Sequence, residues 1–221
     1  MSHDIEHHGL AIVPGVLETD ACQELLSALG PTSGAGRRGL LALPAVARLA
    51  RSPRILDLIR PHLPGPPKAV RALYFDKSAD TNWLVPWHQD LTLALRTRAS
   101  VPGFGPWSLK DGIPHAQPPM VFLEQMLTVR LHLDDADDSN GALRVLPGTH
   151  CLGRLSPGRI QELRRQQSEF LCAVAPGGAL LMRPLLLHAS SRSRSTRPRR
   201  IVHLEYAAFT LPGGLQWHDA A

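Results

Sequence analysis

Two histidine–x–aspartate tripeptides supply the first possible metal-binding residues, His88 with Asp90 and His132 with Asp134. Residues two apart on a β-strand point to the same side, so either pair could present an imidazole and a carboxylate to one ion. A second histidine from a distant strand would complete a two-histidine, one-carboxylate triad. Such a triad suits iron(II) and leaves coordination positions open for small ligands. The tripeptides by themselves do not decide between the two pairs.

His188 is the best distant partner, because it ends the apolar run LLMRPLLLH, which is typical of a strand entering a core. A histidine in such a place can equally be a core residue whose ring binds a backbone carbonyl. The stretch that follows favours a site. A turn between two antiparallel strands would return Arg199 to the side of His188, where its guanidinium could bind one end of a dicarboxylate in a bidentate pair.

The elements that must position these residues change character along the chain. Residues 1–67 contain helical patterns, with helices expected from Thr19 to Leu29 and around 44–50 and 53–62. Residues 68–211 follow a period of two, cleanest in LTVRLHLD, where Leu127, Val129, Leu131 and Leu133 share one face. Further strands are expected near 142–146, 170–174, 179–188 and 200–209. A helical portion followed by short strands and turns predicts one mainly β domain with α+β character, 1–221, built as an antiparallel sandwich or barrel.

Three segments of the chain resemble the phytanoyl-CoA dioxygenase family of Fe(II)- and 2-oxoglutarate-dependent oxygenases. They are WHQD at 87–90, LHLDDADDSNGALRVLPGTH at 131–150 and HASSRSRSTRPRR at 188–200. Each segment alone is a weak signal, but their order and spacing agree with the family. The family places its asparagine–glycine turn after the metal-binding HxD, so the resemblance selects His88 and Asp90 over the second tripeptide.

The resemblance implies a double-stranded β-helix, a cupin-like jelly-roll, behind a helical N-terminal portion. It implies that Fe(II) is held by His88, Asp90 and His188. It also implies 2-oxoglutarate and O2 as cosubstrates and hydroxylation of a small molecule, with release of succinate and CO2. Arg199 would bind 2-oxoglutarate with help from Ser190, and Asn82 either hydrogen-bonds this cosubstrate or shapes a turn.

Substrate contacts are expected around the same centre. Arg130 and His132 share a strand face that either lines the pocket or faces solvent. Trp83 flanks the metal motif, as a pocket wall or as a packing residue. Residues 100–120 have no periodicity and are expected to form a loop that closes over the site, with Trp107 contacting substrate.

The distribution of charge argues against a nucleic-acid partner. The formal charge is +5, and five arginines lie between positions 192 and 200, so the positive excess equals one short stretch. A nucleic-acid surface usually spreads its basic residues over a face among aromatic ones. The four arginines other than Arg199, like the acidic run 134–138, are expected to be solvated turn residues.

Other features of the sequence concern its compartment and the competing functions. We expect no membrane span and no secretory signal, and three scattered cysteines fit a reducing cytoplasm. A cupin-like metal protein with non-oxygenase chemistry and a catalytically silent binding module remain alternatives to the oxygenase. Only the oxygenase requires Arg199, and the sequence leaves the oligomeric state open.

Overall fold

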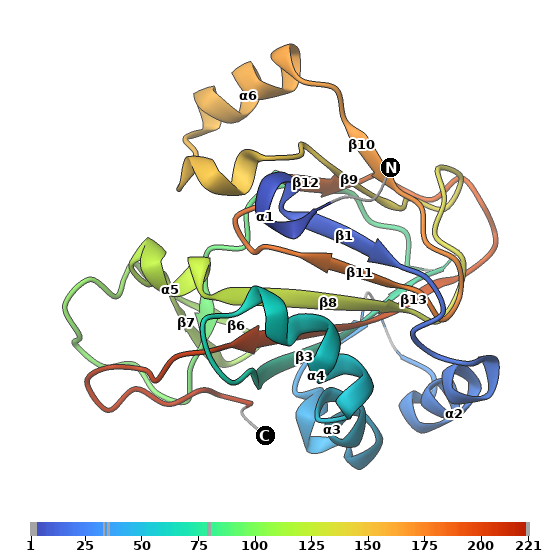
Figure 1. The fold of residues 1–221 in the computed structure, drawn as a ribbon, viewed down its shortest axis with the longest axis horizontal. Coiled ribbons are helices and arrows are strands. Elements are labelled where there is room, and N and C mark those ends of the chain that lie inside the picture. Colours follow the sequence, from blue (N-terminus) through green and yellow to red (C-terminus); the bar gives the residue numbers. More distant parts are fainter. Residues whose placement is uncertain (1–3, 33, 35, 79–80, 220–221) are drawn as a thin grey trace.

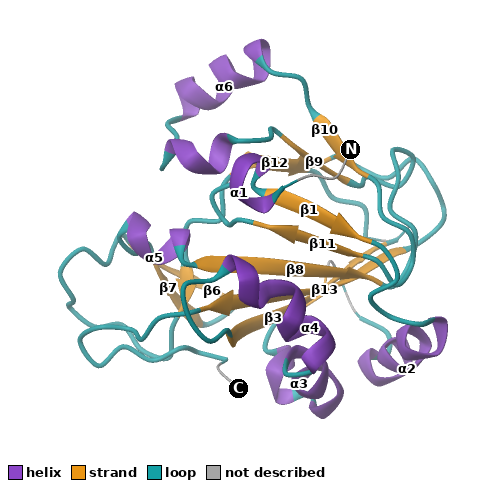
Figure 2. Ribbon diagram, in the orientation of Figure 1, coloured by secondary structure: helices purple, strands orange, loops and turns teal. Residues whose placement is uncertain are grey.

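The computed structural model describes residues 4–32, 34, 36–78 and 81–219. Helices from the N-terminal part of the chain lie against one side of a stack of strands (Figure 1, Figure 2). No helix among the described residues is long and apolar enough to cross a bilayer. The helices are α1 (Ile5–His8), α2 (Thr19–Leu29), η1 (Leu40–Ala42), α3 (Pro44–Ala50), α4 (Pro53–Ile59), η2 (Arg60–His62), α5 (Met120–Glu124), η3 (Thr149–Leu152) and α6 (Pro157–Gln166), where η marks a 3-10 helix.

The strands form two facing antiparallel sheets and a small third sheet. They are β1 (Leu10–Val13), β2 (Gly36–Arg37), β3 (Lys68–Lys77), β4 (Val85–His88), β5 (Leu93–Ala94), β6 (Trp107–Lys110), β7 (Ile113–Ala116), β8 (Met126–His132), β9 (Leu143–Val145), β10 (Phe170–Cys172), β11 (Ala179–Met182), β12 (His188–Ser190) and β13 (Arg199–Ala207). The larger sheet has the order β1-β11-β8-β13-β3-β2, the smaller β10-β9-β12-β4, and the third β5-β7-β6. This is the mainly β, jelly-roll architecture that the sequence predicted.

The alternation predicted for LTVRLHLD is confirmed in β8, and both of its faces are buried. Leu127, Val129 and Leu131 pack with apolar residues of α2, α3 and α4 in the largest core cluster. Burying each such side chain contributes roughly 1.5–3 kcal/mol to the hydrophobic term. Arg130 and His132 occupy the opposite face, toward the smaller sheet, and both are buried. The polar face of this strand therefore lies inside the jelly-roll rather than in solvent.

The N-terminal helices agree with expectation, since α2 and α3 match and α4 with η2 fills 53–62. The strands β1 and β2, which the sequence analysis did not predict, pair with β11 and β3. Gly36 makes the second pairing possible, because a Cβ at this residue would overlap the carbonyl oxygen of Tyr74, and its φ is +151°. The pairing brings the neighbouring Arg38 to the edge of the larger sheet.

Two expectations about the later strands were wrong. Residues 179–188 do not form one strand: β11 ends at Met182, a turn follows in which Leu186 N–H donates to Arg183 O, and His188 begins β12 in the opposite sheet. Residues 100–120 are not irregular throughout, because β6 and β7 form a hairpin around Asp111-Gly112. Both turn residues have positive φ, which is the geometry that Asp-Gly favours in two-residue hairpins.

The acidic run after β8 and the arginine-rich turn before β13 bind each other. Arg200 donates from Nε and Nη2 to the two carboxylate oxygens of Asp134, each at 2.7 Å. Arg200 lies in β13, whereas the acidic residues, Arg194 and Arg197 lie outside the strands, as expected, and form ion pairs. Arg194 pairs with Asp138, and Arg197 pairs with Asp137 and, at 3.6 Å, with Asp135.

Candidate metal centre

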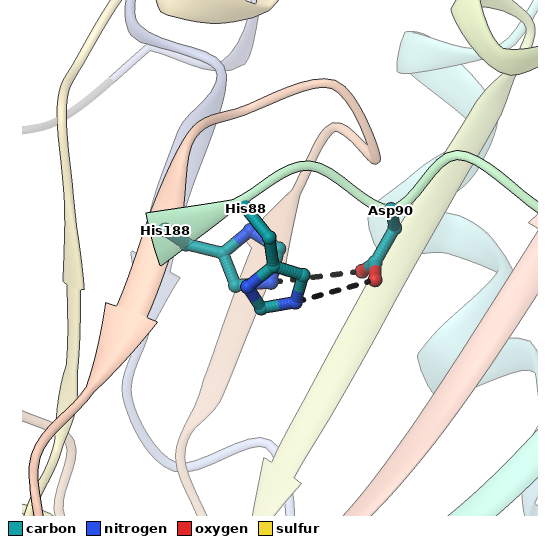
Figure 3. Close-up of side chains that lie close together, drawn as sticks. All are labelled: His88, Asp90 and His188. Carbon is teal, nitrogen blue, oxygen red and sulfur yellow. Dashed lines mark ion pairs between the residues drawn. The ribbon is translucent and has the colours of Figure 1, made fainter. Parts of the chain in front are cut away.

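Strand pairing brings the three predicted metal ligands together. His88 ends β4, His188 begins β12, and the two are direct cross-strand partners. Asp90 follows two residues after the end of β4, and its N–H donates to Pro184 O at 2.9 Å. Figure 3 shows both rings and the carboxylate turned toward one another. Ligand atoms of the three side chains all lie within 4.8 Å of one another, and no other such group occurs in the described part of the chain.

Backbone carbonyl oxygens fix the orientation of both imidazole rings. The Nδ1 of His88 lies 2.8 Å from Pro86 O, and the Nδ1 of His188 lies 2.8 Å from Leu186 O. Each Nδ1 therefore carries the hydrogen and leaves the Nε2 lone pair free. These Nε2 atoms lie 3.8 Å and 3.7 Å from the two oxygens of Asp90. An ion placed among the three side chains would meet two imidazole Nε2 atoms and one carboxylate.

The charge states also fit a divalent metal. Burial lowers the pKa of His188 to about 4, so its ring is neutral. Burial acts to raise the pKa of Asp90, but the neighbouring His188 and His88 outweigh it and hold that pKa below its usual value. Metal ligands must be deprotonated before they bind, and the directions of these two pKa shifts favour that state for His188 and Asp90. The residues present fit Fe(II), which two histidines and one carboxylate suit.

Ser190 lines the cavity with the three metal ligands, and Arg199 lies behind it, in contact with the Ser190 hydroxyl but not lining that cavity. The guanidinium is 3% exposed and donates to Asn140 O at 3.2 Å and to Ser190 Oγ at 3.4 Å. Burial and the nearby Arg130 lower its pKa to about 9. No carboxylate within the described ranges pairs with Arg199. A buried cation without a counter-charge is a strong binding site for an anion.

Lys77 belongs to the same cluster and was not predicted. It is Arg199's cross-strand partner on β3, fully buried, and donates from Nζ to Ser190 Oγ at 2.9 Å and to Ser191 O at 2.6 Å. Burial, Arg199 and Arg130 lower its pKa to about 7. Nothing local in the sequence marks this lysine, because only the register of β3 against β13 puts it beside Arg199.

Arg130 and His132 lie on the inner face of β8. Arg130 lines the cavity that contains the three metal ligands, and its Nη1 lies 2.9 Å from the Nδ1 of His203. Its Nε has no hydrogen-bond partner among the described residues, and neither ring nitrogen of His132 has one. Burial and Arg130 hold the pKa of His132 well below its usual value, so this ring is neutral. Its tripeptide partner Asp134 is bound to Arg200, so the second HxD forms no metal site.

Of the three remaining predicted residues, only Trp83 lies at the cavity with the metal ligands. Trp83 lines the cavity with the metal ligands, and its ring lies 5.0 Å from Lys77 Nζ. Asn82 instead donates to and accepts from the backbone of Ser193, and thereby ties the arginine-rich turn to the chain before β4. Trp107 packs near Phe104 in a separate cluster and lines a different cavity. The structure thus brings Trp83 to the centre but neither Asn82 nor Trp107.

The sequence of this chain matches the phytanoyl-CoA dioxygenase (PhyH) family over residues 35–201. The chain belongs to that family. It is 27% identical over 190 residues to an L-proline trans-4-hydroxylase from Streptomyces griseoviridis. That alignment covers 74% of this chain but only 63% of the hydroxylase.

The chain also resembles solved structures at low sequence identity. EctD from S. alaskensis with bound Fe has a TM-score of 0.71 at 20% identity, covering 92% of this chain and 74% of that one. HygX from Streptomyces hygroscopicus, with nickel and 2-oxoglutarate bound, has a TM-score of 0.65 at 19% identity, covering 94% and 85%. These likenesses establish the jelly-roll fold of the chain.

Proposed function

We propose that this protein is an Fe(II)- and 2-oxoglutarate-dependent dioxygenase that hydroxylates a small-molecule substrate and releases succinate and CO2. The observation that carries the proposal is the convergence of His88, Asp90 and His188 on one point, with both imidazoles held by backbone carbonyls. Bound Fe(II) would supply the redox chemistry that lets 2-oxoglutarate and O2 oxidise an unreactive C–H bond. EctD, solved with bound Fe, and HygX, solved with 2-oxoglutarate, support this choice of cofactors.

The residues of this chain would bind, orient and desolvate the reactants. Arg199 and Lys77 would pair with the distal carboxylate of 2-oxoglutarate, because both are buried cations without an acidic partner in the described chain. Ser190 would help by positioning both cations, since its hydroxyl oxygen accepts from Lys77 and Arg199 while its hydrogen is donated to Gly141 O. Charge-assisted hydrogen bonds of this kind are strongest where water is excluded.

The proposal is tested by adding Fe(II) and then 2-oxoglutarate to the protein without oxygen. A visible charge-transfer band should appear when the keto acid chelates the metal. His88→Ala should lose the band, and Arg199→Ala should require more 2-oxoglutarate to reach it. Folded wild-type protein that binds Fe(II) yet gives no band would favour a cupin-like metal protein with other chemistry, and protein that binds no metal would favour a silent binding module.

We further propose a domain organisation, a compartment and a class of partner for this protein. Residues 1–221 would act as one oxygenase domain, with 1–67 supporting a jelly-roll core at 68–211. A reducing cytoplasm is supported by the three free cysteines, Cys22, Cys151 and Cys172. The partner would be a small molecule and neither nucleic acid nor membrane, since the arginine-rich turn is bound to the chain's own acidic run.

A further inference from the structure

A second group of cations lines the cavity of about 250 Å³ that holds the metal ligands. We call Arg38, Arg71 and Lys110 the outer cations, and Lys77, Arg130 and Arg199 the inner cations. Arg71 Nη1 donates to Glu205 at 2.9 Å, and Arg38 pairs with Asp111 on the β6–β7 turn. Lys77 and Arg199 of the inner group share the hydroxyl of Ser190, whereas Arg71 and Arg38 of the outer group pair with these two carboxylates instead.

The distance along β3 separates the two groups. Lys77 and Arg71 lie six residues apart on this strand, which corresponds to about 20 Å. A chain of polar contacts crosses the gap: Arg130 to His203 at 2.9 Å, and His203 to Glu205 at 3.3 Å, with Arg71 at the far end. The distance of about 20 Å separates backbone positions, and the Arg71 guanidinium is held at the far end of these contacts by Glu205. A 2-oxoglutarate bound by Lys77 and Arg199 would lie at the other end, which leaves the outer cations for another ligand.

Lys110 is the outer cation whose charge is not balanced. Its Nζ donates to Thr92 Oγ1 at 3.2 Å, two residues beyond the ligand Asp90, and it has no carboxylate partner in the described part of the chain. Burial and the neighbouring Arg71 lower the pKa of Lys110. The outer group thus has three cations and two paired carboxylates, Asp111 and Glu205. Its single positive excess fits a monoanion such as a carboxylate better than a phosphate dianion.

Two aromatic residues line the same cavity as the outer cations. Phe75 and Trp83 line the cavity with the metal ligands and also a wider cavity of about 750 Å³, and their rings lie 5.3 Å from Arg130 and 5.0 Å from Lys77 Nζ. Arg38 lines both cavities as well, and Asp111 lines the wider one. A ligand entering through the wider cavity would meet Phe75, Trp83 and Arg38, which line both cavities.

We propose that the substrate is a small organic carboxylate whose anionic group is bound by Lys110, with an apolar body against Phe75 and Trp83. Arg38 and Arg71 add positive potential at the same end of the cavity. This inference rests on the proposed function, because it assigns the inner cations to 2-oxoglutarate and the outer ones to the molecule that is oxidised.

The test uses protein loaded with Ni(II), which prevents turnover, and with 2-oxoglutarate. The probes are cyclopentanecarboxylate and cyclopentanecarboxamide, which share a ring and differ in charge, and binding is measured by titration calorimetry. The carboxylate should bind at least about tenfold more tightly than the amide, as expected for one charge-assisted hydrogen bond. Lys110→Gln should remove that preference, and Lys110→Arg should retain part of it. Lys68→Gln, at an exposed lysine at the start of β3, should change nothing.

The outcomes separate the two proposals. Equal binding of both probes, no binding of either at millimolar concentration, or an unchanged preference in Lys110→Gln would overturn the substrate class, provided that 2-oxoglutarate still binds. Lys110→Gln should bind 2-oxoglutarate as the wild type does, which shows that its fold and inner cations are intact. Wild-type protein that does not bind 2-oxoglutarate would overturn the proposed function and this inference together.

Discussion

Lys77 allows the assignment of the inner cations to be tested by counting protons. The ammonium is fully buried and its charged neighbours, Arg199 and Arg130, are both positive, so its pKa is lowered to about 7. A carboxylate bound between Lys77 and Arg199 would supply the missing negative charge and return the lysine toward its ordinary pKa of 10.5. Binding of 2-oxoglutarate above pH 7 should therefore be accompanied by proton uptake.

The size of the uptake follows from the pKa. At pH 8 a group with a pKa of about 7 is roughly one-tenth protonated, so binding should take up about 0.9 proton. At pH 6 the same group is already about nine-tenths protonated, and uptake should fall to about 0.1 proton. Arg199 contributes little, because a guanidinium stays charged at either pH.

The assay is calorimetric titration of Ni(II)-loaded protein with 2-oxoglutarate in buffers of different ionisation enthalpy. The slope of the observed enthalpy against the buffer enthalpy gives the number of protons exchanged. Loading the metal first keeps the protons of the histidine ligands out of the measurement. Lys77→Met should abolish the uptake at pH 8 and weaken binding, whereas Lys68→Met should behave as the wild type. Negligible uptake by the wild type at pH 8, or the same uptake in Lys77→Met, would refute the reasoning.

Three other predictions concern the metal, the ion pairs and stability. His88→Ala should lower Ni(II) affinity by roughly a hundredfold or more in equilibrium dialysis, while circular dichroism stays native; retained affinity would exclude this ligand. Arg200→Ala should lower the urea-unfolding free energy by about 1–3 kcal/mol, because the half-buried Asp134 loses two charged hydrogen bonds, whereas Arg194→Ala at an exposed pair should change it by less than about 0.5 kcal/mol. Similar losses of unfolding free energy in Arg200→Ala and Arg194→Ala would contradict the distinction between the half-buried and the exposed ion pair. Between pH 7 and 10 the unfolded chain binds more protons at Lys77 than the folded chain does. The unfolding free energy of the ligand-free protein should therefore rise with pH because of Lys77, by up to about 1.4 kcal/mol per pH unit. Lys77→Met should show a smaller rise than the wild type in thermal melts over this range.

The site was predicted best where its residues carry a motif. His88, Asp90 and His188 were found because their types and order match a family, and the register of β4 against β12 then explains why residues a hundred apart meet. Lys77 and Lys110 were missed for a physical reason. Each is an ordinary lysine in its local sequence: Lys77 is buried beside Arg199 only through the pairing of β3 with β13, and the exposed Lys110 reaches the cavity with the metal ligands only through the folding of the β6–β7 hairpin against it.

The fold was predicted best where periodicity is unambiguous. The alternation in β8 was clear, but sequence could not say that its polar face lies inside, because that depends on the helices that cover the apolar face. The apolar run 179–188 was read as one strand, since hydrophobicity alone does not show where the chain crosses from one sheet to the other. The β6–β7 hairpin was missed although Asp111-Gly112 is a strong turn signal, because the prolines around it conceal the short strands.

The charged residues illustrate what the sequence alone reveals, their positions along the chain, and what only the tertiary structure reveals, their partners. The sequence by itself determined that the positive excess equals the five arginines of one short stretch and that four aspartates, Asp134, Asp135, Asp137 and Asp138, crowd another. Only the tertiary structure decided their roles, because ion pairing acts through space over a few ångströms and is blind to separation along the chain. Packing β13 between β3 and β8 brings the two stretches together as ion pairs and leaves Arg199 buried beside Lys77, with no carboxylate partner among the described residues.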